Sequence, residues 1–242
     1  MELLQRPLKG GGKERRAMKG EREKISSRER GETSTFFEEC AYRRGHLCVA
    51  GVDEAGRGAL AGPVVASACV IPPQVIISGV GDSKSLSPQR REELYEILIR
   101  HPSVECGFGV VSNLRIDEKN ILQASMEAME IAVRHLDVRP DYLLADGCHA
   151  PNVEMEVQTL VKGDARSQTI GAASILAKVY RDRLMETYHR KWPIYRFDQN
   201  RGYGTSFHRQ AIRRFGPCEI HRFSFAPIRS MTLPLGRRLL PV

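Results

Sequence analysis

The sequence has no long hydrophobic run. No window in its 242 residues approaches the roughly 18 consecutive apolar residues of a membrane-spanning helix. The N-terminus also lacks the apolar core of a secretory signal, and its acidic residues and glycines argue against a transit peptide. These absences predict a cytoplasmic protein with no membrane partner.

The six cysteines include no C-x-x-C pair. Such a spacing would have indicated a zinc site, and a dense cysteine pattern would have indicated a disulfide framework. We therefore expect reduced thiols, which agrees with a cytoplasmic location.

Acidic residues are fewer than basic residues. The formal net charge is +8, and residues 1–35 contribute ten Lys or Arg against six Glu, a net of +4. An excess of positive charge favours an acidic partner, of which nucleic acid is the commonest. Residues 1–35 have few large apolar side chains, so they are predicted to form a flexible basic tail. Residues 36–242 are then the folded domain, which ends in a helical segment.

Hydrophobic periodicity and turn residues predict a mixed order of strands and helices. A short helix over 36–45 precedes two strands, 46–53 and 62–71, which we expect to pair as a hairpin. Later strands are expected at 104–112, 142–145 and 155–161. Helices are expected at 88–100 with Ser87 as N-cap, and at 116–136, 170–191 and 205–215. This order predicts an α/β fold in which α-helices flank a central mixed β-sheet.

Residues 49–62 carry the most informative stretch, VAGVDEAGRGALAG. An apolar strand leads into Asp53 and Glu54, and Gly56-Arg57-Gly58 follows. Adjacent strand residues point to opposite faces, so the two carboxylates converge on one ion only if the strand ends there and the turn bends the chain. A solvated corner between strand and turn is the alternative reading of these residues.

Two further carboxylates occupy similar positions. Asp146 ends the strand at 142–145, and Asp164 follows the strand at 155–161. Sites in open α/β sheets collect outside the strand ends, so the four carboxylates of these segments are expected to meet. Their repulsion requires cations, and hard oxygen ligands without His or Cys select Mg²⁺ or Mn²⁺. Two such ions are the arrangement used for in-line displacement at a phosphodiester.

Six motifs occur in series between residues 47 and 227. They are DEAGRG at 53–58, GDSKSLS at 81–87, ADG at 145–147, KGDARSQTIGAASILAKVYRD at 162–182, RGYGT at 201–205 and IHRFSF at 220–225. Together and in this order they resemble the ribonuclease HII (type 2 ribonuclease H) family.

The resemblance implies an RNase H-like fold and a metal-dependent endoribonuclease. Its substrates would be RNA–DNA hybrids and duplex DNA that contains single ribonucleotides, nicked on the 5′ side to leave a 3′-hydroxyl and a 5′-phosphate. The catalytic, metal-binding carboxylates would be Asp53, Glu54 and Asp146, with Asp164 as the fourth. Asp182 is the rival for the fourth place, but it lies well inside the following helix, so we expect it to form salt bridges instead.

Substrate contacts are also implied by the resemblance. Backbone groups of Gly56, Arg57 and Gly58 would contact the 2′-hydroxyl, which distinguishes RNA from DNA. Tyr203 would stack on the sugar beside the scissile junction, and Lys84 and Ser85 would contact phosphate. We expect the protein to act as a monomer.

Two other functions remain open from the residues alone. Similar carboxylate clusters serve other metal-dependent nucleases such as junction resolvases, although the Gly-Arg-Gly turn and Tyr203 concern ribose rather than DNA shape. A nonenzymatic nucleic-acid-binding module would need the basic surface but would have no use for four clustered acids.

Overall fold

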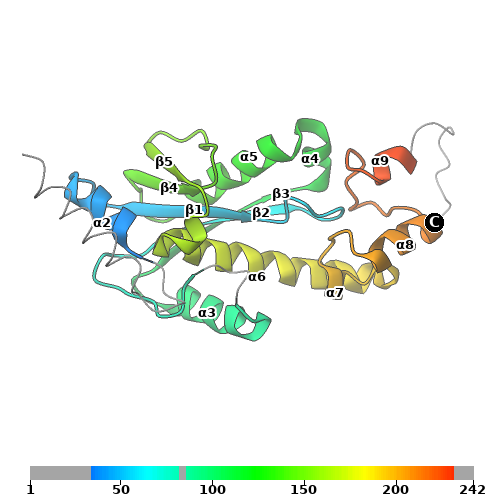
Figure 1. The fold of residues 1–242 in the computed structure, drawn as a ribbon, viewed down its shortest axis with the longest axis horizontal. Helices are drawn as coiled ribbons and strands as arrows, with labels where there is room; N and C mark the ends of the chain where they lie inside the picture. Colours follow the sequence, from blue (N-terminus) through cyan, green and yellow to red (C-terminus); the bar gives the residue numbers. More distant parts are fainter. Residues whose placement is uncertain (1–33, 82–85, 232–242) are drawn as a thin grey trace, which may run out of the picture. The chain divides into compact units, whose positions relative to one another are not determined.

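The computed structural model describes residues 34–81 and 86–231 of the chain, and Figure 1 shows their arrangement. Within these residues, five strands form one mixed sheet in the order β3-β2-β1-β4-β5. The strands are β1 Val49–Ala55, β2 Val64–Val70, β3 Glu105–Val111, β4 Tyr142–Asp146 and β5 Glu156–Leu160. The helices are α2 Phe36–Arg43, α3 Pro88–Arg100, α4 Asn113–Lys119, α5 Ile121–Arg134, α6 Gln168–Lys191, α7 Phe197–Asn200, α8 Ser206–Phe215 and α9 Ile228–Met231, and the 3-10 turns are η1 Gly163–Ala165 and η2 Pro193–Tyr195.

The sheet has an antiparallel half and a parallel half. β1 pairs antiparallel with β2, and β2 pairs antiparallel with β3. On its other side β1 pairs parallel with β4, which pairs parallel with β5. The predicted hairpin and the predicted mixed sheet are therefore confirmed, and β1 is the strand at which the two halves meet.

Helices cover both faces of the sheet (Figure 1). On one face, side chains of α5 such as Met129 pack against β1, β2 and β4. On the other face, α3 and α6 pack together against β2, with Leu94, Ile175 and Leu176 in the shared core. Because α6 packs against β1, it lies beside the end of the sheet at which β1 and β4 terminate.

Close packing of α6 on β1 depends on Gly51. A Cβ atom at this position would lie 2.3 Å from the backbone carbon of Thr169, so any other residue would push the helix away. A second contact comes from α2, because the buried Glu38 carboxylate accepts hydrogen bonds from Ser167 Oγ at 2.7 Å and Thr169 N at 2.9 Å. A carboxylate at a helix N-terminus satisfies unpaired backbone donors and interacts favourably with the helix dipole. Glu38 thus holds the start of α6 in place.

The single helix predicted over 116–136 is wrong. The structure divides it into α4 and α5 at Asn120, whose φ is 84°. The Asn120 backbone is not helical, and its side chain accepts a hydrogen bond from Gln123 N as the N-cap of α5. The hydrophobic periodicity continues across the break, which is why the pattern alone did not reveal it.

The C-terminal helical segment is also more divided than predicted. The helix expected over 205–215 is α8, with Thr205 as its N-cap, but it is not the final helix because α9 follows it. η2, α7 and α8 surround a small core of their own that includes Tyr195, Phe197 and Ile212. This segment packs against residues 60–61, just beyond the Gly-Arg-Gly turn.

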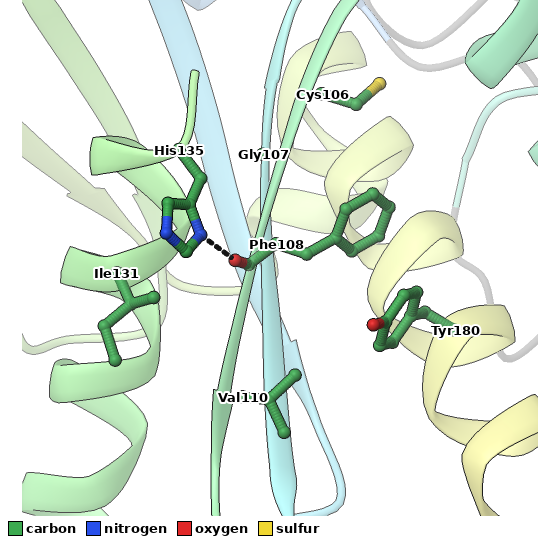
Figure 2. A pocket seen from close by; sticks show the side chains of 7 residues that line it. All are labelled: Cys106, Gly107, Phe108, Val110, Ile131, His135 and Tyr180. Atoms are coloured by element: carbon green, nitrogen blue, oxygen red, sulfur yellow. Dashed lines mark hydrogen bonds between the residues drawn. The ribbon is translucent and has the colours of Figure 1, made fainter. Parts of the chain in front are cut away.

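An open hollow of about 460 Å³ lies at the outer edge of the sheet (Figure 2). Its lining residues come from β3, α5 and α6 and the residue after α5, and are Cys106, Gly107, Phe108, Val110, Ile131, His135 and Tyr180. His135 Nδ1 lies 2.7 Å from the carbonyl oxygen of Phe108, which covers part of the unpaired edge of β3. The hollow contains none of the predicted site residues.

Three expectations from the sequence concern the cysteines, membrane-spanning helices and the N-terminal tail. All six cysteines are free thiols. None of the helices in the described ranges combines the length and the apolar character required to cross a bilayer. The predicted tail, residues 1–35, lies outside the described residues except for its last two positions.

Candidate functional site

The parallel pairing of β1 with β4 brings Asp53 and Asp146 together at the end of the sheet where both strands terminate. Val52 is the partner of Ala145 in this register, so each aspartate is the next residue along its strand. Asp53 is buried, because β1 lies beneath α6 at this point. Two carboxylates that are distant in sequence therefore lie side by side, as expected for a site at the ends of parallel strands.

Glu54 leaves the opposite face of β1. The strand does not end at Asp53, as the sequence had suggested, but continues to Ala55, which still pairs with Val65 of β2. Alternation along the strand therefore separates the two neighbouring side chains. The Glu54 carboxylate is nevertheless only 8% exposed, and it forms an ion pair with Arg57 Nη1 at 3.1 Å.

Asp164 lies on a turn that is attached to Asp146. The η1 turn follows β5, and the backbone N–H of Gly163 donates to Asp146 Oδ1 at 2.6 Å. The Asp164 side chain is buried and accepts from Ala165 N within the same turn. Its rival, Asp182, instead forms ion pairs with Lys178 and Arg201. The salt-bridging role expected for Asp182 is confirmed.

Electrostatic contact links three of the four carboxylates. Burial raises the pKa of Asp53 well above its usual value, and the charges of Glu54 and Asp146 raise it further. Burial likewise raises the pKa of Glu54, and Asp146 contributes in the same direction against the opposing effect of Arg57. Burial is the largest cause of both pKa shifts, and the charge of Asp146 contributes to both.

These side chains, in their present positions, do not form a coordination shell for a cation. In residues 34–81 and 86–231, no three His, Cys, Asp or Glu side chains lie in an arrangement that could hold a metal ion. Protein donors occupy the carboxylates instead: Glu54 N binds Asp53, Arg57 binds Glu54, and Gly163 N binds Asp146. The donor set still fits a hard divalent cation, because the excess negative charge is carried by carboxylate oxygens alone.

The Gly56-Arg57-Gly58 turn follows directly after β1. Gly56 has a φ of +96°, and a Cβ atom there would lie 2.0 Å from Arg181 Nε, so both backbone conformation and space demand glycine. Gly58 differs, because a Cβ atom at that exposed position would meet nothing within 4 Å. The turn is therefore tight against the protein at its first glycine and open at its second.

Tyr203 is held beside this turn. Ala59 and Tyr203 form an isolated antiparallel bridge, and Leu60 N donates to Gly202 O at 2.8 Å. The Tyr203 ring is half-buried, with the Arg181 guanidinium 5.4 Å from its centroid. The structure thus brings Tyr203 together with the Gly-Arg-Gly turn, although the two are far apart in sequence.

Two buried histidines position the Tyr203 backbone. His208 Nδ1 lies 2.9 Å from Tyr203 O, and the Nε2 atoms of His208 and His221 lie 3.1 Å apart. Cys218 N donates to His221 Nδ1 at 2.9 Å. These contacts form one chain of donors and acceptors if both rings are neutral, with the proton on Nδ1 of His208 and on Nε2 of His221.

This histidine pair should make the protein sensitive to acid. Burial lowers the pKa of both rings, that of His221 to about 4. An unfolded histidine titrates near pH ~6.5, so as the pH falls from about 6.5 towards 4 the unfolded chain gains protons that the folded chain excludes. The free energy of unfolding is expected to decrease over this range, by about 3 kcal/mol from His221 alone.

Urea denaturation at several pH values measures this effect. The variant His221→Asn should have a flatter dependence of unfolding free energy on pH between 6.5 and 4 than the parent protein. His149→Asn is the matched control, because His149 is exposed. Equal pH dependence in His221→Asn and the parent would contradict the neutral pair.

Lys84 and Ser85 lie outside the described residues, so their predicted phosphate contacts stay predictions. Two other residues were missed by the sequence reasoning. Arg181 and Arg222 are fully buried beneath the Gly-Arg-Gly turn and donate to its neighbouring carbonyls. Both stand within quoted motifs, KVYRD and IHRFSF, but an arginine in a motif indicates a surface contact more readily than a buried one.

Comparison with known proteins gives a consistent result. Residues 50–228 match the family model described as Ribonuclease HII. The chain is 52% identical to Ribonuclease HII of Chlamydia caviae over 199 residues, which cover 82% of this chain and 93% of the relative. The matched residues include every candidate residue described above.

Solved structures agree with the fold. Ribonuclease H2 from Pyrococcus horikoshii OT3 superposes with a TM-score of 0.64 at 28% identity, over 76% of this chain and 97% of that one. RNase HII from Archaeoglobus fulgidus, solved in a complex with PCNA, superposes with a TM-score of 0.61 at 26% identity, over 80% and 98% of the two chains. The mixed sheet with flanking helices is therefore the RNase H-like fold that the motifs had implied.

Proposed function

The chain belongs to the ribonuclease HII family, and from that premise we propose that it nicks duplex DNA on the 5′ side of a single embedded ribonucleotide. Family membership makes it a ribonuclease H, a hydrolase that cuts the RNA strand of RNA–DNA hybrids internally. The observation that supports the finer proposal best is the parallel register of β1 and β4, which sets Asp53 beside Asp146 next to the Gly-Arg-Gly turn.

Asp53, Glu54, Asp146 and Asp164 are the residues that would hold Mg²⁺ or Mn²⁺. Two such ions, when bound, supply an activated water and neutralise charge on the leaving oxygen. Burial and the charge of neighbouring carboxylates support the assignment, because both raise the pKa of Asp53 and Glu54, and a bound cation would favour the charged form of each. With water as the nucleophile and the 3′-oxygen of the preceding nucleotide as the leaving group, the products are a 3′-hydroxyl and a 5′-phosphate, and no covalent enzyme intermediate forms.

Ribose recognition is assigned to the backbone of Gly56, Arg57 and Gly58. The open space around Gly58 supports this role, because a sugar can approach its backbone without meeting a side chain. Tyr203 stacks on the sugar beside the scissile bond, and its bridge to Ala59 keeps it next to the turn. Lys84 and Ser85 bind phosphate in this proposal. The enzyme acts as a monomer in the cytoplasm, where it makes the first incision in the removal of ribonucleotides from DNA.

A labelled DNA duplex with one ribonucleotide tests the proposal. The full chain is incubated with this duplex, with an all-DNA duplex of the same sequence and with a continuous RNA–DNA hybrid, each with Mg²⁺, with Mn²⁺ and with chelator. We expect metal-dependent nicking on the 5′ side of the ribonucleotide, cleavage of the hybrid and an intact all-DNA duplex.

Other outcomes would exclude parts of this function. Cleavage of the all-DNA duplex would indicate a general or structure-specific nuclease. Cleavage of the hybrid alone would remove the single-ribonucleotide activity. Binding without cleavage under either metal would favour a nonenzymatic nucleic-acid-binding protein.

A further inference from the structure

Two buried arginine side chains lie beneath the Gly-Arg-Gly turn. Arg181 comes from the middle of α6 and Arg222 from the segment between α8 and α9, and both have 0% exposure. Arginine is rarely buried to this extent unless its charge is paired. Here the hydrogen bonds that the structure gives both guanidinium groups all go to backbone carbonyls, not to carboxylates.

The accepting carbonyls belong to the irregular stretch after the turn and to the Tyr203 segment. Arg222 donates to Arg57 O at 2.8 Å and to Gly62 O at 3.0 Å. Arg181 donates to Pro63 O at 2.9 Å and Ala61 O at 3.2 Å, and its third nitrogen donates to Arg201 O at 2.9 Å. The two side chains thus act as a template for residues 57–63, which have no strand partners along most of their length.

Arg181 also contacts the two elements assigned to ribose recognition. It lies directly against Gly56, where a Cβ atom would come within 2.0 Å of its Nε. On its other side the guanidinium lies over the Tyr203 ring, 5.4 Å from the centroid. One buried side chain therefore determines the separation between the turn and the tyrosine.

Burying these two guanidinium charges is unfavourable for the free energy of folding. Burial lowers the pKa of both arginines, that of Arg222 to about 9, and the positive charge of Arg181 adds to the shift of Arg222. Nη2 of Arg222 is buried with no hydrogen-bond partner among the described residues. A packed apolar side chain would avoid these penalties, so filling space does not account for the pair. The planar fork of a guanidinium, which binds two carbonyls at fixed positions, does account for it.

We propose that Arg181 and Arg222 are positioning residues that set the discrimination between ribose and deoxyribose by holding the Gly-Arg-Gly turn and Tyr203 in one rigid frame. This inference rests on the proposed function, because it concerns the same recognition elements. Neither arginine acts on the reacting phosphate. Loss of either should weaken the binding of a ribonucleotide at the site and leave the rate of the chemical step nearly unchanged.

Arg222→Lys and Arg181→Lys are the test variants, because lysine retains the charge but has one nitrogen where the carbonyls need two or three. Arg100→Lys is the matched control, since Arg100 is exposed on α3 and pairs only with Glu96 in the ion pairs of the described residues. Thermal unfolding and circular dichroism establish that each variant is folded. Discrimination is measured as the inhibition constant of an all-DNA duplex divided by the KM of the matched single-ribonucleotide duplex.

We expect each test variant to lower this ratio at least tenfold through a higher KM, with kcat within threefold of the parent and the inhibition constant of the DNA duplex unchanged. Arg100→Lys should keep the parent ratio. An unchanged ratio in both test variants, a fall in kcat at constant KM, or failure of both variants to fold would overturn the inference. If the unsubstituted chain does not cleave or shows a ratio near one, the proposed function itself fails.

Discussion

Asp53→Asn should abolish cleavage of the single-ribonucleotide duplex, with a loss of about 10³-fold or more, equivalent to ~4 kcal/mol of transition-state stabilisation. The amide has nearly the same shape as the carboxylate but carries no charge, so it removes the anionic ligand at the centre of the cluster. Binding of the RNA–DNA hybrid should remain within threefold of the parent. Single-turnover cleavage with Mg²⁺ and a separate binding titration measure the two effects.

The same substitution should also stabilise the protein. Asp53 is buried beside Glu54 and Asp146, and its raised pKa shows that the folded state disfavours its charge. Removing the charge is expected to increase the free energy of unfolding by about 1 kcal/mol in chelator at neutral pH. A gain in stability together with a loss of activity is a combination that a damaged fold does not produce.

Asp182→Asn is the matched control for this prediction. It replaces the other aspartate that could have been the fourth ligand, and its ion-pair partners, Lys178 and Arg201, are like Asp182 itself partly buried. Cleavage by Asp182→Asn should stay within about threefold of the parent, because the substitution leaves all four carboxylates of the cluster in place. Full activity in Asp53→Asn, or complete loss in Asp182→Asn, would refute the assignment of the carboxylates.

Gly56→Ala should strongly destabilise the protein and Gly58→Ala should not, although the two glycines are separated by one residue. Alanine at position 56 must adopt a φ near +96° and would overlap Arg181, so we expect the free energy of unfolding to fall by about 3 kcal/mol. Alanine at position 58 has open space and no unusual φ, so its effect on stability should stay within about 0.5 kcal/mol.

Substrate binding should separate the two variants a second time. If a sugar approaches the backbone at position 58, the added methyl group occupies that space, and Gly58→Ala should raise the KM for the single-ribonucleotide duplex about tenfold without loss of stability. Denaturant unfolding and steady-state kinetics measure the two properties. A parent-like KM in Gly58→Ala would show that this backbone is not approached by substrate, and a parent-like stability in Gly56→Ala would contradict the close packing on Arg181.

Local features of the fold were predictable because their causes are local. Ser87 precedes Pro88 at the start of α3, and its side chain accepts from Arg90 N as the pattern indicated. The apolar β-branched segments around Asp53 and after Gly62 form the predicted hairpin. Asn120 is the counterexample, because the hydrophobic repeat continues through it and only the backbone shows that the helix is interrupted.

Residue types and their order also determined the candidate chemistry. Carboxylates at the ends of apolar strands already indicated a hard cation, and six motifs in series indicated the family. These are properties of the chain itself. They do not depend on where the side chains finally point.

The tertiary structure alone decided how the site is built. Whether Asp146 lies beside Asp53 depends on β4 pairing with β1, a contact between segments about ninety residues apart that no local pattern encodes. The same is true of Glu38 at the start of α6, of the His208–His221 pair, and of the two arginines beneath the turn. Burial of a charged group is stable only when distant backbone groups are brought to meet it, and that compensation exists only in the folded chain.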